Sequence, residues 1–115
     1  KPSEYVYNGT LQDASLHGDR MVLAVASYSG GSEIVEFDGG DSPVTRFSLG
    51  EAVLSVDSSG TTLAVLTEGT IRTYLSGTGD KTAERPAGSD ARAIALGNAG
   101  TAYVLGNGEV RRVDL

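Results

Sequence analysis

The chain contains no cysteine and no tryptophan, and it has one histidine among its 115 residues. Without a thiol it forms no disulfide, no cysteine-ligated zinc site and no cysteine nucleophile. Acidic residues outnumber basic ones by 15 to 9, which gives a formal net charge of −6. Because the phosphate backbone repels a negative protein, we expect no nucleic-acid partner. No apolar run approaches the roughly 20 residues of a membrane-spanning helix.

Long segments free of helix breakers are also scarce. The 16 glycines and 3 prolines divide the chain into short pieces, and only residues 19–29 run beyond ten residues without either. Strands average five or six residues and helices about 11, so these pieces fit strands better. Val, Thr, Ile, Tyr and Phe fill them, whereas Lys occurs only at Lys1 and Lys81. The sequence therefore predicts an all-β fold.

An internal repeat is the strongest pattern. A strand-like segment recurs three times, at residues 33–38, 70–75 and 109–114. Each copy follows a more apolar run that begins after a glycine, at residues 21–26, 63–66 and 102–105. A further short piece precedes each glycine, at residues 13–16, 53–57 and 92–96. Such a period of about 40 residues is typical of β-propeller blades.

The repeat predicts three tandem antiparallel blades over residues 12–50, 51–90 and 91–115. More polar fourth strands are expected at residues 44–49 and 81–85, and the last blade lacks its outer strand. Residues 4–10 are expected to form a separate outer strand, with Tyr5 and Tyr7 on one face. Each third strand has two apolar residues three positions apart: Ile34 and Phe37, Ile71 and Tyr74, and Val110 and Val113. Each pair points to opposite faces, so both faces of each sheet should be covered, as in stacked propeller blades. An irregular β-sandwich or partial barrel is the alternative.

The layout resembles WD-repeat or PQQ-like propellers, although the WD dipeptide is absent. Residues 53–71, together with the final Arg112-Val113-Asp114-Leu115, resemble the C-terminal part of an uncharacterised Firmicute family. Its members are membrane-anchored proteins that carry an extracytoplasmic propeller-like domain of unknown function. The resemblance implies an extracytoplasmic location at the cell surface and a membrane link only through an N-terminal anchor outside this sequence. It implies no catalytic residues.

Three blades are too few for a closed ring, because propellers usually have four to eight. Three completions are open: the chain is a fragment of a larger propeller, several copies associate, or residues 4–10 supply the missing strand of the third unit. We favour association of copies, six units in a dimer, because end blades otherwise expose apolar faces.

Motifs for catalysis are weak. His17 lies in a predicted turn beside Asp13 and Asp19, where polar residues are expected in any case, and no nucleophile-elbow sequence accompanies it. Residues 76–82 superficially suggest a phosphate loop, but Asp80 precedes Lys81 and no helix follows. Asp38, Asp41, Glu51 and Asp57 have no calcium-loop spacing. We expect neither a metal nor a cofactor.

Interface candidates are aromatic and arginine side chains. Tyrosine offers a flat surface at low entropic cost, and arginine is enriched where proteins meet. The candidates of these two types are Tyr5, Tyr7, Tyr28, Arg111 and Arg112. Tyr74 and Tyr103 should instead be covered by neighbouring blades.

Two functions fit these observations. The first is a non-catalytic extracytoplasmic propeller scaffold that binds a protein or cell-envelope partner, as a homo-oligomer or as part of a larger propeller. The alternative is a module of a propeller hydrolase or lyase with carboxylates gathered at the central channel. With one His and no Cys, the sequence favours the scaffold.

Overall fold

Strands account for all the regular secondary structure in the part of the chain that the computed structural model describes, residues 6–28, 30–98 and 100–115. No helix in these ranges could cross a membrane. The strands are β1 (Gly9–His17), β2 (Arg20–Ser27), β3 (Ser32–Asp38), β4 (Thr45–Leu49), β5 (Ser55–Ser58), β6 (Thr62–Thr67), β7 (Gly69–Leu75), β8 (Lys81–Gly88), β9 (Ala93–Leu96), β10 (Thr101–Leu105) and β11 (Val110–Asp114).

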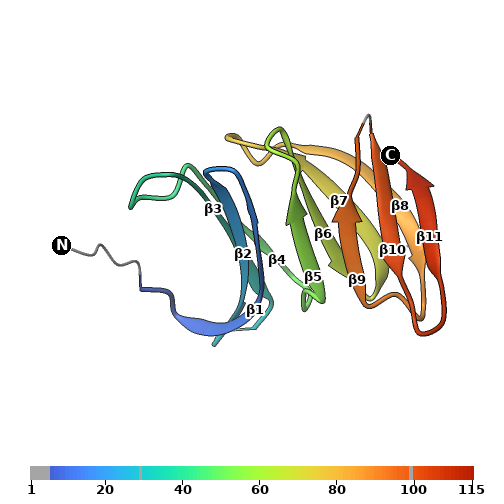
Figure 1. Cartoon of the computed structure of the whole chain (residues 1–115). Coiled ribbons are helices and arrows are strands. Elements are labelled where there is room, and N and C mark those ends of the chain that lie inside the picture. Colours follow the sequence, from blue (N-terminus) through green and yellow to red (C-terminus); the bar gives the residue numbers. More distant parts are fainter. Residues whose placement is uncertain (1–5, 29, 99) are drawn as a thin grey trace.

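The strands form three antiparallel sheets in chain order. Sheet one is β1-β2-β3-β4, sheet two is β5-β6-β7-β8, and sheet three is β9-β10-β11. Figure 1 shows the sheets side by side, with sheet one at one end and sheet three, which carries the C-terminus, at the other. These findings confirm the prediction of an all-β chain with two four-stranded blades and a third that lacks its outer strand.

Apolar side chains fill the spaces between successive sheets. Alternation along a strand sends Val22, Ala24 and Ile34 toward sheet two, where they meet Leu63 and Val65. On the other side of sheet two, a second cluster joins it to sheet three; its buried members are Ala64, Leu66, Ile71, Ala87, Ala91, Ile94, Ala102 and Val104. Both faces of sheet two are therefore covered, which is why β6 is almost entirely buried.

The face of sheet one that points away from sheet two is also apolar. Leu23, Val25, Val35 and Phe37 form a buried cluster there, and Tyr7 packs against it. Residues 6–8, which precede β1, thus contribute a cap to this end of the stack. The opposite end of the stack has a different character.

The outward face of sheet three is open. Val110 is 63% exposed and Tyr103 is 42% exposed, whereas Tyr74 in sheet two is buried. Within the described residues of one chain, no neighbouring blade covers Tyr103 or the outward face of this sheet, so the expectation of covered faces is not met there. The reason is its position: sheet two covers one face, and nothing in the described residues lies on the other.

The separate outer strand expected over residues 4–10 is not formed where the structure describes it. Glu4 and Tyr5 lie outside the described residues, residues 6–8 belong to no strand, and Gly9 and Thr10 open β1. No glycine or proline interrupts the chain from Thr10 to His17, so one long strand accommodates both predicted pieces through a β-bulge at Gln12.

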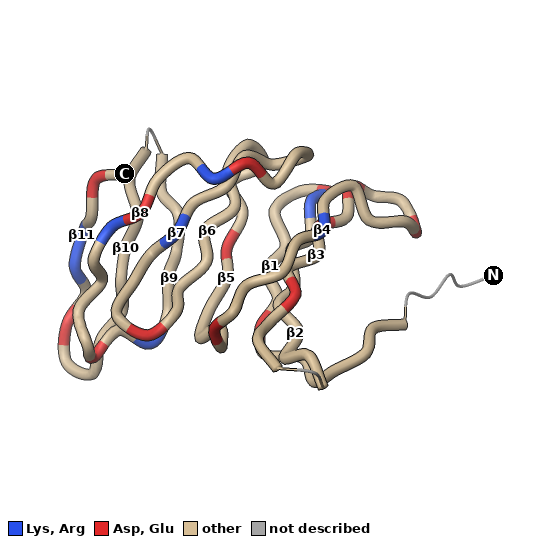
Figure 2. Tube along the Cα trace, turned by 180° about the vertical axis from the view of Figure 1, so that it is seen from behind, with Lys and Arg blue, Asp and Glu red and all other residues tan. Residues whose placement is uncertain are grey.

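Charged side chains are unevenly distributed over the strands of sheets two and three. Figure 2 shows Lys and Arg along β7, β8 and β11, while the middle strands β6 and β10 carry no charge. The charges on β8 and β11 lie where water solvates them, whereas Glu36 on the middle strand β3 is buried.

Candidate functional site

Polar side chains on β1 and β5, the first strands of sheets one and two, connect each sheet to the next. An Asp13 carboxylate oxygen accepts a hydrogen bond from the Val56 N–H at 2.8 Å. One Asp57 oxygen accepts from the Ser15 hydroxyl at 2.5 Å, and the other accepts from the Leu96 N–H at 2.6 Å. Asp57 therefore joins β1, β5 and β9, and these carboxylates are occupied by structural bonds.

A second link between sheets one and two is built around a buried carboxylate. The Glu36 side chain on β3 has no exposed surface, and it forms an ion pair with Arg20 at 3.1 Å. It accepts hydrogen bonds from Thr45 at 2.7 Å, from the Gly77 N–H at 2.9 Å and from the Ser76 hydroxyl. Burial alone would raise the pKa of Glu36, but these hydrogen bonds outweigh it and hold the pKa below its usual range.

The loop that superficially suggested phosphate binding therefore holds an anion of the chain itself. Ser76 and Gly77 lie after β7, and their hydroxyl and amide groups point at Glu36 of sheet one. The sequence could not show this, because Glu36 stands 40 residues away in another blade. The Ser76 hydroxyl and the Gly77 amide are therefore already engaged by Glu36.

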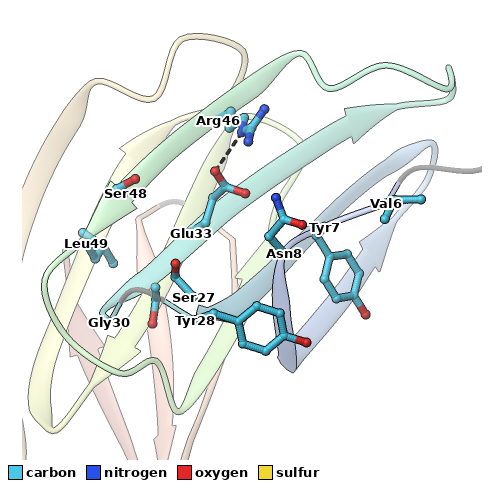
Figure 3. A pocket seen from close by; sticks show the side chains of 11 residues that line it. Val6, Tyr7, Asn8, Ser27, Tyr28, Gly30, Glu33, Arg46, Ser48 and Leu49 are labelled. Atoms are coloured by element: carbon cyan, nitrogen blue, oxygen red, sulfur yellow. Dashed lines mark hydrogen bonds and ion pairs between the residues drawn. The ribbon is translucent and has the colours of Figure 1, made fainter.

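A pocket opens beside the N-terminal end of sheet one. Its volume is about 550 Å³, and it is lined by Val6, Tyr7, Asn8, Ser27, Tyr28, Gly30, Ser32, Glu33, Arg46, Ser48 and Leu49. Figure 3 shows the Tyr7 and Tyr28 rings on one side and the Glu33–Arg46 ion pair on another. The Arg46 Nε lies 2.8 Å from a Glu33 carboxylate oxygen. Tyr28 is 81% exposed, so its ring is available to a partner.

The predicted interface residues do not form one surface. Tyr7 and Tyr28 share this pocket, whereas Arg111 and Arg112 lie on β11 at the far end of the stack (Figure 1). Tyr5 lies outside the described residues. Arg111 is held by Asp90 at 3.1 Å and by the Ala87 carbonyl at 2.6 Å. Arg112 is two-thirds exposed.

The pocket is the feature that sequence reasoning missed. Glu33 and Arg46 were not singled out, because they stand on different strands whose pairing brings them together. The pair could have been found by predicting the strand register between residues 33–38 and 44–49. It would have placed opposite charges on neighbouring strands, an arrangement that stabilises a sheet.

The described residues do not assemble the site that the hydrolase or lyase alternative expects. They bring no three His, Asp or Glu side chains together in a metal-binding arrangement. His17 is exposed at the β1–β2 turn, beside Gly60 of the β5–β6 turn. A hydrogen bond from Lys81 lowers the pKa of Glu84, and one from Arg111 lowers that of Asp90. A general acid at neutral pH needs the opposite shift.

Comparison with known proteins identifies the fold. No family model matches the chain, and no curated protein sequence matches it. Among solved structures, BamB from Moraxella catarrhalis superposes on 92% of the chain with a TM-score of 0.73 and 17% identity. Sqt1 from Saccharomyces cerevisiae covers 91% with a TM-score of 0.64 and 15% identity. The computationally designed Ika4 protein covers 98% with a TM-score of 0.60 and 11% identity.

These similar structures are β-propellers, so the three sheets are propeller blades. The chain spans 34% of BamB and 32% of Sqt1, about a third of each. It spans 96% of Ika4. At these identities the likeness concerns the fold alone, and the resemblance to the Firmicute family remains an expectation.

Proposed function

We propose that the chain is a non-catalytic scaffold segment of a β-propeller that binds a protein partner. The observation that carries this proposal is the pocket beside sheet one, where two tyrosine rings and an arginine–glutamate pair are displayed together. Tyrosine and arginine are the side chains that most often anchor protein interfaces.

The state of the other polar groups supports a scaffold over an enzyme. Asp13 and Asp57 accept hydrogen bonds from backbone amides of the next sheet, and Glu36 is enclosed between two sheets. These side chains stabilise the stack, and their carboxylate oxygens are engaged in bonds between the sheets.

The scaffold, in this proposal, acts outside the cytoplasmic membrane and contacts a protein of the cell envelope. The support is the resemblance of residues 53–71 and 112–115 to an extracytoplasmic family. Further blades, from other copies or from a longer polypeptide, complete the propeller. The open outward face of sheet three supports this part.

Site-specific photo-cross-linking tests the binding site. We expect benzoylphenylalanine at Tyr28 to give one discrete protein adduct in cells of the source organism, and Arg46→Ala to weaken it. The same probe at exposed Thr61, in the β5–β6 turn, is the matched control and gives no such adduct. Equal adducts at both positions, or none at Tyr28, contradict the proposed binding site.

The location is tested separately with a membrane-impermeant amine reagent on intact cells. Lys81 is half exposed, so it reacts if the domain faces outward. Labelling that appears only after lysis contradicts the extracytoplasmic part and leaves the binding site untouched.

A further inference from the structure

The turn between β10 and β11 contains an asparagine followed by a glycine, Asn107 and Gly108, and both residues are exposed. A hydrogen bond from the Gly106 N–H to the Glu109 carbonyl, at 2.9 Å, closes the turn. Within the described residues, no group accepts a hydrogen bond from the Gly108 N–H. Nothing lies within 4 Å of the position that a Gly108 Cβ would occupy. The Gly108 nitrogen is therefore accessible and has no partner in this part of the chain.

A cation holds the side-chain carbonyl of Asn107. Arg92, in the loop from β8 to β9, donates a hydrogen bond from Nε to Asn107 Oδ1. The backbone N–H of Arg92 donates to the Leu105 carbonyl at 2.8 Å, which fixes this loop to the end of β10. The backbone N–H of Asn107 donates to the Asp90 carboxylate. A hydrogen bond from a charged donor draws electron density toward Oδ1, so the side-chain carbon Cγ is more open to attack by a nucleophile.

The acidic groups beside the turn are already paired with another cation. Asp90 lies 3.1 Å and Glu109 lies 2.6 Å from guanidinium nitrogens of Arg111. Arg92 forms no ion pair with any residue that the structure describes. Its positive charge is therefore available to stabilise negative charge that develops on Asn107 Oδ1.

The backbone nitrogen and the side-chain amide of this pair can react with each other. After the Gly108 N–H loses its proton, the nitrogen attacks Cγ of Asn107 and closes a five-membered succinimide ring. The bond from Cγ to the side-chain nitrogen breaks, and that nitrogen leaves as ammonia after taking up a proton. Water then opens the ring at one of its two carbonyls, which gives aspartate or isoaspartate. Glycine favours the closure because its backbone rotates without hindrance from a side chain.

We propose that Asn107 is a site of spontaneous deamidation, and that Arg92 promotes the reaction by stabilising the oxyanion that forms on Oδ1. The reacting groups belong to adjacent residues, so water is the only other reactant that the conversion consumes. The product replaces a neutral amide beside the Arg92 guanidinium with a carboxylate, and it adds one negative charge to this rim of the stack. The inference goes beyond the scaffold function and does not depend on it.

The other asparagine–glycine pair of the chain provides an internal comparison. Asn8 precedes Gly9, the first residue of β1, and Gly9 stands opposite Ser27 of β2. A Cβ on Gly9 would lie 2.0 Å from the Ala26 carbonyl oxygen, so this glycine is packed closely against β2. Ring closure at Asn8 would require the start of β1 to detach from the sheet, and such local opening slows a reaction.

Mass spectrometry of the folded full chain tests the proposal. After incubation in mildly alkaline buffer, trypsin leaves Asn8 in one peptide and both Asn98 and Asn107 in another, and fragmentation locates each conversion. We expect Asn107 to convert about tenfold faster than Asn8, and faster than Asn98, which alanine follows. In urea, the two asparagine–glycine pairs should react at similar rates. No conversion at Asn107, equal rates at Asn8 and Asn107 in the folded chain, or a difference that persists in urea overturns the proposal.

Two substitutions test the roles of the cation and the nucleophile. R92Q removes the charge and should slow conversion at Asn107 about fivefold without changing the rate at Asn8. R85Q changes another exposed arginine and is the matched control, with no effect on either site. An unchanged or faster rate in R92Q overturns the assigned role of Arg92, because the hydrogen bond would then be neutral or protective.

G108A should also slow the conversion, because a methyl group hinders ring closure. The turn has room for this methyl group, so the fold is retained, and thermal unfolding of the variant checks this. The succinimide route also requires isoaspartate among the products at Asn107. An unchanged rate in G108A, or aspartate as the sole product, shows direct hydrolysis of the side chain and overturns the proposal.

Discussion

Glu36 shows how one side chain can join two blades. Its carboxylate is enclosed between sheets one and two, and it receives donors from both. A buried charge is tolerated only when hydrogen bonds and an opposite charge compensate for lost hydration. Here Arg20 and the amide of Gly77 provide that compensation. Removing the Glu36 charge should therefore weaken the packing of sheet one against sheet two.

Acid should weaken the fold through this residue. The pKa of Glu36 is lowered in the folded state, so its contribution to stability is present above the unfolded pKa of about 4.3 and is lost as pH falls below it. We expect Glu36→Gln to lower the free energy of unfolding at pH 7 by about 1–3 kcal/mol and to flatten the acid limb. Urea unfolding at several pH values measures both. Exposed Glu68→Gln is the control, and an unchanged acid limb in Glu36→Gln contradicts this assignment.

Tyr74 should ionise late. Burial raises its pKa, and its ring packs edge-on against Phe47 with centroids 4.4 Å apart. Its stabilisation is therefore present below the unfolded pKa of about 10 and is lost as pH rises above it. In an alkaline titration of tyrosinate absorbance, we expect Tyr74 to give a late step because of its raised pKa. Tyr74→Phe should remove that late step, and its persistence in the variant refutes the assignment.

At the scale of single elements, the glycine turns were the most predictable feature. Glycines punctuate the chain where strands end, and the strands lie close to the predicted ranges because short apolar pieces cannot form long helices. The positions of glycine and proline did not predict the bulge at Gln12. It joins two predicted pieces by pairing with β2, a tertiary interaction that local pattern does not contain.

The β2–β3 turn depends on Gly31. Its φ of +71° lies in the left-handed region, and a Cβ there would lie 2.4 Å from the Leu49 carbonyl oxygen. We expect Gly31→Ala to destabilise the fold by about 1–3 kcal/mol. Gly108→Ala is the matched control, because nothing lies within 4 Å of its Cβ position. Thermal unfolding of the two variants measures the difference. Equal melting temperatures would show that the turn accommodates a Cβ at position 31 without strain.

From the sequence, Asp57 was considered only as an acidic residue without calcium-loop spacing, yet it connects three strands. Its bonds to Ser15 and Leu96 span neighbouring blades, and their register could not be read from one repeat. We expect Asp57→Ala to cost about 2–4 kcal/mol, because the Leu96 N–H and the Ser15 hydroxyl lose a charged acceptor. Exposed Asp41→Ala should change little. A small effect at Asp57, measured by urea unfolding, would show that water replaces the carboxylate.

At the scale of the whole molecule, the repeat predicted the order of the three sheets. The position of each sheet in the stack determined which residues depart from the predicted burial. Ile34 and Ile71 are buried as expected, whereas the equivalent Val110 is exposed. Local sequence is similar at the three positions. What differs is whether another sheet follows, and this is a property of the assembly.

Association of copies remains our expectation for the open face. We expect light scattering at high concentration to give a mass above the 11.8 kDa of one chain, and Val110→Lys to reduce it toward that value. Leu16→Lys changes an exposed leucine at the end of β1 and serves as the control. A wild-type mass near 11.8 kDa at every concentration counts against association.

The two ends of the stack differ in a way that gives the molecule a polarity. At one end, Tyr7 packs over the apolar cluster of sheet one. At the other end, Ala93 and Ala95 face outward where the preceding innermost strand carries Ser55 and Asp57. A newly docked unit would find methyl groups in place of the acceptors that hold blades two and three. A unit docked on this face would therefore be held by apolar contact and shape, without the hydroxyl and carboxylate acceptors that join blades two and three.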